Sequence, residues 1–314
     1  MGENQDFAAS LQDSKAAYVL SNVAEVVERI LTFVPTKSLL RIANDKHIKQ
    51  FKKSRHSPAT VEELNLLFPN NCDIMGIATP GIVTPSGPCS SPPQEYQEGE
   101  AGFAIMFPSM EGVNIKPFHF CKKSISPATL KEALVDNPEL RVVLVFVYEA
   151  YKSGGARFLR QILEPLAKTK ALIAGGLVES VFSPPRHCSQ GAYGVVGLAL
   201  SGPKVQGASV LLDQDISNPK AAETTIRRLK AAKIPERNTL GFMFACVGRG
   251  QNYYNNQPNV EANAFHKVFP NTPLFGLFGN GEIGCDRIVK DDYTLCDTDT
   301  DTLQHEYTTV MTLV

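Results

Sequence analysis

The sequence predicts an α+β fold, in which a short helical arm precedes a layered sandwich of mixed, largely antiparallel sheets flanked by helices. Three observations lead to this prediction. Apolar residues recur at helical spacing on both sides of Pro35, strand-like segments come in neighbouring pairs around glycine-containing turns, and helical segments stand between those pairs. Hairpins that alternate with helices favour separate layers over a purely parallel, doubly wound sheet.

The composition limits the classes of function. The 314 residues suggest about two domains, although one large domain stays possible. A formal charge of −1 lacks the basic excess of a dedicated nucleic-acid binder. The N-terminus is polar and no apolar run approaches the ~18 residues of a membrane span, so we expect neither a secretory signal nor membrane insertion.

The cysteines indicate a reducing compartment. Their number, seven, is odd, and no CxxC spacing occurs. Such a pattern predicts reduced thiols rather than a zinc cage or a disulfide framework, as in the cytoplasm and nucleus.

The N-terminal region is predicted to be a disordered segment, 1–17, followed by a helical arm and linker, 18–56. Ser21 or Asn22 can cap the first helix, and Pro35 interrupts the pattern before a second helix. Two short helices bury little surface by themselves, so we expect their apolar stripe to bind a partner. The stripe consists of Val23, Val27, Ile30, Leu31, Val34, Pro35, Leu39 and Leu40.

The remaining region, 57–314, is predicted to hold the sheets, with an N-terminal part at 60–135 and a C-terminal part at 136–314. One helix is expected at 60–68. Three strand pairs are expected as hairpins, at 103–107 with 113–120, at 193–200 with 205–212, and at 274–278 with 283–289 around Asn280-Gly281. Single strands are expected at 74–79, 141–148, 172–174, 240–246 and 307–314.

The segment 141–148 is continuously apolar, which predicts a central strand buried on both faces. The stretch 81–100 is rich in Gly, Pro and Ser and is predicted to be a mobile loop. Helices are expected at 127–135, 156–166, 218–233 and 259–269, and the third begins with Asn218 as a cap and Pro219 in its first turn.

Residues 19–43 resemble the opening half of an F-box, the helical unit that docks on the Skp adaptor of a cullin scaffold. The informative part is the elbow Leu31-Thr-Phe-Val-Pro35 followed by Leu39-Leu40-Arg41. The resemblance implies that the apolar stripe is the adaptor-binding surface. The resemblance to an F-box stops after Ala43. There Asn44-Asp-Lys-His stands in place of the Trp-containing turn of a full F-box, and the chain has no Trp. The F-box is therefore expected to be truncated and its adaptor binding weakened.

The motifs GFMFACVGRG at 241–250 and PLFGLFGNGEIG at 273–284 resemble the signature stretches of FIST C-terminal modules, which are linked with intracellular signal sensing. An F-box followed by a FIST module implies the substrate-recognition subunit of a Skp–cullin–F-box ubiquitin ligase. Such a subunit has no catalytic residues and promotes ubiquitination and proteasomal degradation of the proteins that it binds.

Four residues are candidates for ligand or substrate contact: Cys246, Arg249, Asn280 and Glu282. Cys246 is either an accessible thiol beside Arg249 or a small residue packed before a glycine turn. Arg249 and Glu282 either hold a zwitterionic ligand such as an amino acid, in a small-molecule-sensing module that joins no ligase, or form a structural ion pair.

No cofactor or metal site is expected. The chain lacks GxGxxG and GKS or GKT motifs, which argues against nucleotide binding. Asp297, Asp299 and Asp301 begin like a calcium-binding loop, but Thr302 and Thr308 occupy the positions that require Gly and Glu.

Overall fold

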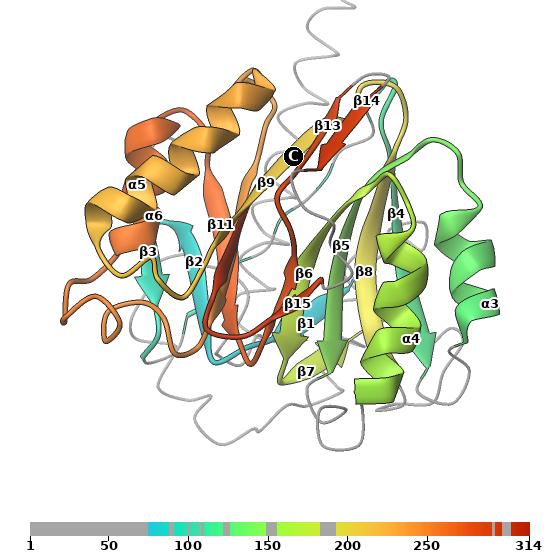
Figure 1. The fold of residues 1–314 in the computed structure, drawn as a ribbon, viewed down its shortest axis with the longest axis horizontal. Helices are drawn as coiled ribbons and strands as arrows, with labels where there is room; N and C mark the ends of the chain where they lie inside the picture. Colours follow the sequence, from blue (N-terminus) through green and yellow to red (C-terminus); the bar gives the residue numbers. More distant parts are fainter. Residues whose placement is uncertain are drawn as a thin grey trace, which may run out of the picture.

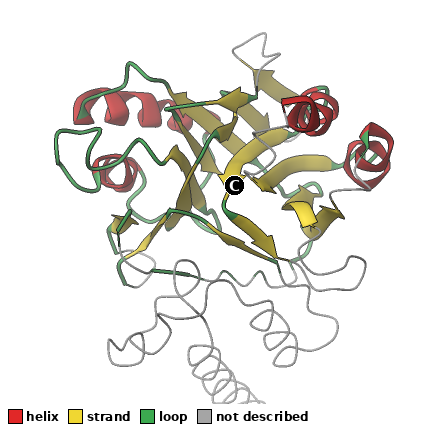
Figure 2. Cartoon of the chain, turned by 90° about the horizontal axis from the view of Figure 1, so that it is seen from below, coloured by secondary structure: helices red, strands yellow, loops and turns green. Residues whose placement is uncertain are grey.

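Two large β-sheets pack face to face in the computed structural model, and helices cover the outer face of each sheet (Figure 1). The structure describes residues 75–87, 91–98, 101–103, 105, 107, 110–121, 126–148, 156–182, 193–290, 293–296 and 303–314. The predicted helical arm with its stripe residues, the helix at 60–68 and the acidic run from Asp297 to Thr302 lie outside these residues. Seen from below, the four layers of helix, sheet, sheet and helix follow one another (Figure 2).

One sheet has eight strands. In spatial order they are β14 (Tyr293–Cys296), β13 (Arg287–Lys290), β9 (Gly207–Leu212), β16 (Thr309–Leu313), β10 (Gly241–Cys246), β11 (Leu274–Gly279), β2 (Gly81–Pro85) and β3 (Pro93–Tyr96). β10 and β11 run parallel, and the other pairings are antiparallel. The helices α5 (Pro219–Arg227) and α6 (Val260–Val268) cover its outer face.

The other large sheet has six strands. In order they are β15 (Gln304–His305), β12 (Glu282–Gly284), β6 (Leu172–Val178), β5 (Leu140–Tyr148), β8 (Tyr193–Ser201) and β4 (Asn114–Cys121). Only β5 and β6 are parallel among these described pairs. A further antiparallel pair joins β1 (Gly76–Ala78) to β7 (Ser180–Phe182). These pairings confirm mixed, largely antiparallel sheets.

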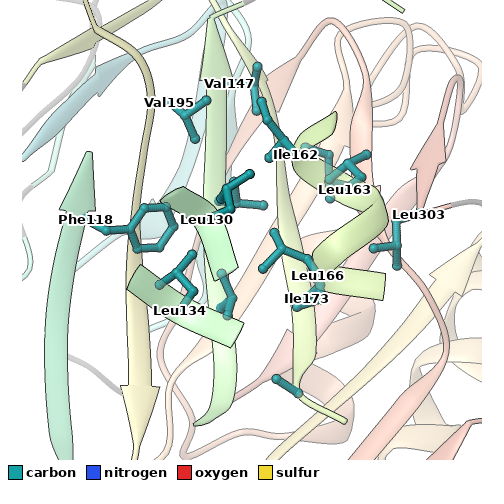
Figure 3. Packing of buried hydrophobic residues seen from close by; sticks show 14 of the residues in the cluster. Phe118, Leu130, Leu134, Val147, Ile162, Leu163, Leu166, Ile173, Val195 and Leu303 are labelled. Carbon is teal, nitrogen blue, oxygen red and sulfur yellow. The ribbon is translucent and has the colours of Figure 1, made fainter. Parts of the chain in front are cut away.

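Helices on the six-stranded sheet seal its outer side. α3 (Pro127–Leu130) continues into a π-helical turn (Lys131–Val135), and α4 (Ala156–Ala167) lies beside it. Leu130, Leu134, Ile162 and Leu166 are buried against this sheet (Figure 3). The helices expected at 127–135 and 156–166 are therefore confirmed.

The strand β5 confirms the prediction of a central, doubly buried strand. It lies between β6 and β8. Val143, Val145 and Val147 face the helices. Val142, Leu144 and Phe146 face the other sheet. A strand covered on both sides needs no polar face, which explains its unbroken apolar sequence.

Two of the three expected hairpins are wrong in the same way. β8 and β9 belong to different sheets, as do β11 and β12, so the turns at Gly202 and at Asn280-Gly281 carry the chain from one sheet to the other. The third expected hairpin fails because residues 103, 105 and 107 form no strand, and β4 pairs with β8 instead. Local turn chemistry marks a reversal of the chain, but it does not say whether the next strand stays in the same sheet.

The predicted mobile loop at 81–100 is also wrong, because it contributes β2 and β3. β2 pairs with β11 on one side and with β3 on the other, and Gly81 permits the approach of β3, since a Cβ there would meet Tyr96 O at 2.6 Å. The sequence signal for β2 is only the short run Gly81-Ile-Val-Thr-Pro85, and the Gly, Pro and Ser residues around it favour a loop.

The predicted helix cap is confirmed, whereas the prediction of reduced cysteines is wrong at one residue. Asn218 caps α5, because its Oδ1 accepts a hydrogen bond of 2.9 Å from Ala221 N. By contrast, Cys121 is disulfide-bonded, so the expectation of seven reduced cysteines is wrong at this position. No helix in the described part of the chain has the length and hydropathy needed to cross a membrane.

Candidate functional site

The candidate residues gather where β10 and β11 end. Cys246 closes β10, Arg249 follows three residues later, and Glu282 opens β12. The two loops are bound together, because Val247 N donates to Gly279 O at 2.8 Å. β10 and β11 are parallel neighbours, so their ends meet at one edge of the sheet.

Arg249 is fully buried in an ion pair, but its partner is Glu261 rather than Glu282. Its Nη2 lies 2.7 Å from Glu261 Oε1, and both side chains are 0% exposed. Burial by itself would lower the pKa of Arg249, but the adjacent Glu261 carboxylate outweighs it and raises this pKa. The guanidinium therefore stays charged.

Every N–H of the Arg249 side chain has an acceptor. Nε donates to Glu261 Oε1 at 2.8 Å, and Nη2 donates to Tyr254 OH and Ile216 O. Nη1 donates to the carbonyl oxygens of Asp213 and Tyr307 at 3.3 and 3.2 Å. The side chain thus ties together three loops and has no donor left for a ligand carboxylate in this arrangement.

Aromatic groups complete the enclosure. The ring centroid of Tyr253 lies 4.4 Å from the Arg249 guanidinium carbon. The hydroxyl of Tyr254 donates to Glu261 Oε1 at 2.7 Å. Burial, followed by the charge of Glu261, raises the pKa of the Tyr254 hydroxyl, which remains protonated.

Glu95 adds a second carboxylate from β3 at the start of α6. Its Oε1 accepts from Ala262 N at 2.9 Å, and Asn259 Oδ1 accepts from Glu95 N at 2.7 Å. Burial, followed by the charge of Glu261, raises the pKa of Glu95 to about 7. This reciprocal pair fastens the edge strand β3 to the N-terminus of α6.

Cys246 and Glu282 are brought together. Both are buried, and Glu282 Oε2 accepts from Thr308 N at 3.0 Å and from Thr308 Oγ1 at 2.8 Å. Burial raises the pKa of Glu282 to about 7, and the bonds from Thr308 and Cys246 oppose that rise. Burial also raises the pKa of the Cys246 thiol, and the charge of Glu282 adds to it. The thiol is therefore held protonated rather than activated as a thiolate.

Asn280 stands at the turn between the two sheets. Its N–H donates to Leu177 O at 3.1 Å, and Leu177 N donates to Gly281 O at 2.9 Å. Gly281 has φ +149°, which a residue with a side chain rarely adopts. The role of this pair in the described structure is to attach the crossover to β6.

Sequence reasoning missed Glu95, Glu261 and Tyr254. Glu261 could have been noticed as an acidic residue in the first turn of a predicted helix, but nothing in the sequence joins it to Arg249. Glu95 was hidden in a segment predicted to be a loop. Within the described residues, no group of three or more His, Cys, Asp or Glu side chains is placed to hold a metal ion.

The comparisons with known proteins agree with the signature motifs. The chain matches the FIST N domain at residues 51–217 and the FIST C domain at residues 200–285. F-box only protein 22 of Pongo abelii is 41% identical over 389 residues, which cover 98% of this chain and 96% of the relative. F-box only protein 22 of Homo sapiens is 41% identical over 382 residues, with coverages of 96% and 95%.

The first alignment also shows a difference in length. It extends over 389 positions and exceeds the 314 residues of this chain by 75. At least that many aligned positions have no counterpart here. A shortened chain was expected from the interrupted F-box pattern after Ala43.

Proposed function

The chain belongs to the family of F-box only protein 22, and from this we propose that it is the substrate-recognition subunit of a Skp–cullin–F-box ubiquitin ligase. The observation that carries the proposal is 41% identity to a protein of that name across 98% of the chain, because this coverage includes the F-box-like arm as well as the FIST region.

We propose a mechanism based on proximity. The arm docks on the Skp adaptor and hence on the cullin scaffold, while the FIST region holds a protein substrate near the ubiquitin-charged enzyme. Holding two reactants together raises their effective concentration, so the receptor needs no catalytic residue of its own. Ubiquitinated substrate then goes to the proteasome, in the cytoplasm or the nucleus.

The buried groups of the candidate site support this non-catalytic role. Arg249 has all its side-chain donors engaged, and the thiol of Cys246 has a raised pKa. A nucleophilic cysteine requires the opposite, a lowered pKa and an accessible sulfur. The same network gives the loops around Arg249 one fixed arrangement, as a docking surface requires.

The test is co-elution of the purified chain with the Skp adaptor. We expect a complex with the wild-type chain and its loss when Val27, Leu31 and Leu39 are all changed to Asp, because charged groups would replace the apolar stripe. Met110→Asp is the matched control, since it adds a carboxylate at an exposed apolar residue of the folded body. Retention of the adaptor by the triple variant would refute the proposed interface.

The affinity of the chain for the Skp adaptor tests whether the interrupted F-box still provides a complete binding surface. Missing anchor residues would remove part of the buried contact surface, so we expect weaker adaptor binding than in the longer relatives. The measurement is the dissociation constant for the adaptor, compared with that of human F-box only protein 22 under the same conditions.

A second candidate function is a sensor of amino-acid-like molecules without a ligase role, and the match to both FIST domains favours it. In the present arrangement a ligand carboxylate would have to displace Glu261 or a carbonyl from Arg249. A thermal-shift screen with amino acids tests this function, and a stabilising ligand whose effect disappears in Arg249→Ala would support it.

A further inference from the structure

An exposed apolar surface lies directly above the buried Arg249 network. Tyr307 is 56% exposed and Val247 is 42% exposed. Gly248, the next residue after Val247, lies against the Tyr307 ring, since a Cβ at this glycine would be 3.2 Å from that ring. We call Val247, Gly248 and Tyr307 the tyrosine surface. The two exposed side chains, Val247 and Tyr307, offer apolar area to a partner.

The backbone of Tyr307 is strained. Its φ is +61°, a left-handed conformation that is a genuine outlier for a bulky residue. The surroundings enforce it, because Arg249 Nη1 donates to Tyr307 O while Cys246 N donates to the neighbouring Thr308 O at 3.0 Å. Backbone strain of this kind gathers at ligand-binding sites. The side chain nevertheless stays more than half exposed, so core packing does not explain its position.

The tyrosine surface has an acidic border. Asp213, Asp215 and Glu306 are exposed. The loop of the two aspartates is joined to Glu306 through Gln214, whose Nε2 donates to Glu306 O at 3.0 Å. Asp213 O also accepts from Arg249, the residue that holds Tyr307. The charge of the buried Arg249 is neutralised by Glu261 beneath the surface.

We propose that the tyrosine surface binds a protein segment in which a Lys or Arg side chain lies next to an apolar one. The cation would lie over the Tyr307 ring within reach of the acidic border, and the apolar side chain would cover Val247. The bound segment is a substrate only if the proposed receptor function holds. Peptide binding itself does not require the Skp adaptor.

Fluorescence anisotropy with the full-length chain provides the test. The probe is a labelled synthetic peptide of lysine, arginine and leucine residues spaced by serine, and a second peptide has glutamate in place of each cation. We expect the cationic peptide to bind and the acidic one to bind at least about tenfold more weakly. The expected affinity falls as salt is added.

Two variants locate the site. Tyr307→Asn removes the ring and suits the positive φ, so we expect about fivefold weaker peptide binding with an unchanged or higher melting temperature. A purely structural tyrosine would give the reverse, a lower melting temperature and unchanged binding. Asp215→Asn removes one border charge and should also weaken binding, whereas Met110→Ala, at an exposed apolar residue elsewhere, should not.

The proposal is overturned if neither peptide binds, if the acidic peptide binds as tightly as the cationic one, or if Tyr307→Asn binds like the wild-type chain. Adaptor co-elution is measured separately, so loss of one activity with retention of the other shows which proposal has failed.

Discussion

At the scale of single residues, Arg249 stands out because its charged side chain is fully buried and all its N–H groups are hydrogen-bonded. Its place between two glycines after a strand marks Arg249 as a candidate in the sequence, which suggests Glu282 as a partner. The partner in the structure is Glu261, twelve residues along the chain. Sequence position suggested that Arg249 matters. Which carboxylate it meets depends on the packing of α6 against the loop, and no local pattern contains that information.

The buried pair leads to the first prediction. Arg249→Met leaves the buried side chain of Glu261 without its ion-pair partner, so we expect the free energy of unfolding to fall by ~3–5 kcal/mol. The double variant Arg249→Met with Glu261→Leu should recover much of this loss, because both charged groups are then absent from the interior. Urea denaturation of the two single variants and the double variant measures the coupling. Losses that simply add would show that the pair does not act as a unit.

Glu95 gives a prediction about pH. Its pKa rises from 4.5 to about 7 in the folded chain, so the folded state binds a proton that the unfolded state has released between these values. Stability therefore falls as pH rises from about 4.5 to 7, by up to ~3 kcal/mol. Glu95→Gln should reduce this fall, and Glu98→Gln, at an exposed neighbour, should leave it unchanged. Melting temperatures between pH 5 and pH 8 would contradict the prediction if the Glu95→Gln and wild-type curves ran parallel.

At the scale of elements, the sequence predicted helices better than strand partners. The helix at 127–135 and the capped helix from Asn218 are confirmed because caps and apolar spacing are local signals. The hairpins failed for the opposite reason. Gly202 and Asn280-Gly281 produce chain reversals, but the strands after them pair with partners far away in the sequence. Two sheets of similar strand composition cannot be told apart from local residues.

The cap of α5 is directly testable. Asn218→Ala removes the acceptor of the Ala221 N–H, and we expect the free energy of unfolding to fall by ~1 kcal/mol. Asn218→Asp keeps an acceptor oxygen at the same place and should retain most of the stability. Equal losses in both variants would mean that the side-chain bond is not what stabilises this helix.

At the scale of the whole molecule, the two sheets share one core. Phe146 of β5 meets Phe244 of β10 edge to face, with ring centroids 5.8 Å apart. Both rings are buried in the layer between the sheets. The sandwich should therefore unfold as a unit rather than one sheet at a time. The layered α+β architecture could be predicted because strand pairs that alternate with helices in the sequence indicate separate layers. The assignment of each strand to one sheet could not be predicted, because it depends on pairing between distant residues.

Phe244→Ala tests this unity. The variant leaves a cavity between the sheets, and we expect the free energy of unfolding to fall by ~3–5 kcal/mol with one transition retained. Calorimetry compared with the loss of far-ultraviolet circular dichroism gives the measurement. Leu163→Ala, on the helical side of the other sheet, is a control that should lower the same single transition. Two separated transitions would show that the sheets unfold independently.

The place of β16 has a consequence during synthesis on the ribosome. This strand comes after the others in the chain, yet it lies inside the eight-stranded sheet, between β9 and β10. While translation is still short of Thr309, the nascent chain exposes two unpaired strand edges in the middle of its largest sheet. Unpaired strand edges are sites of aggregation, so the described eight-stranded sheet is protected at its middle only once β16 has paired with β9 and β10.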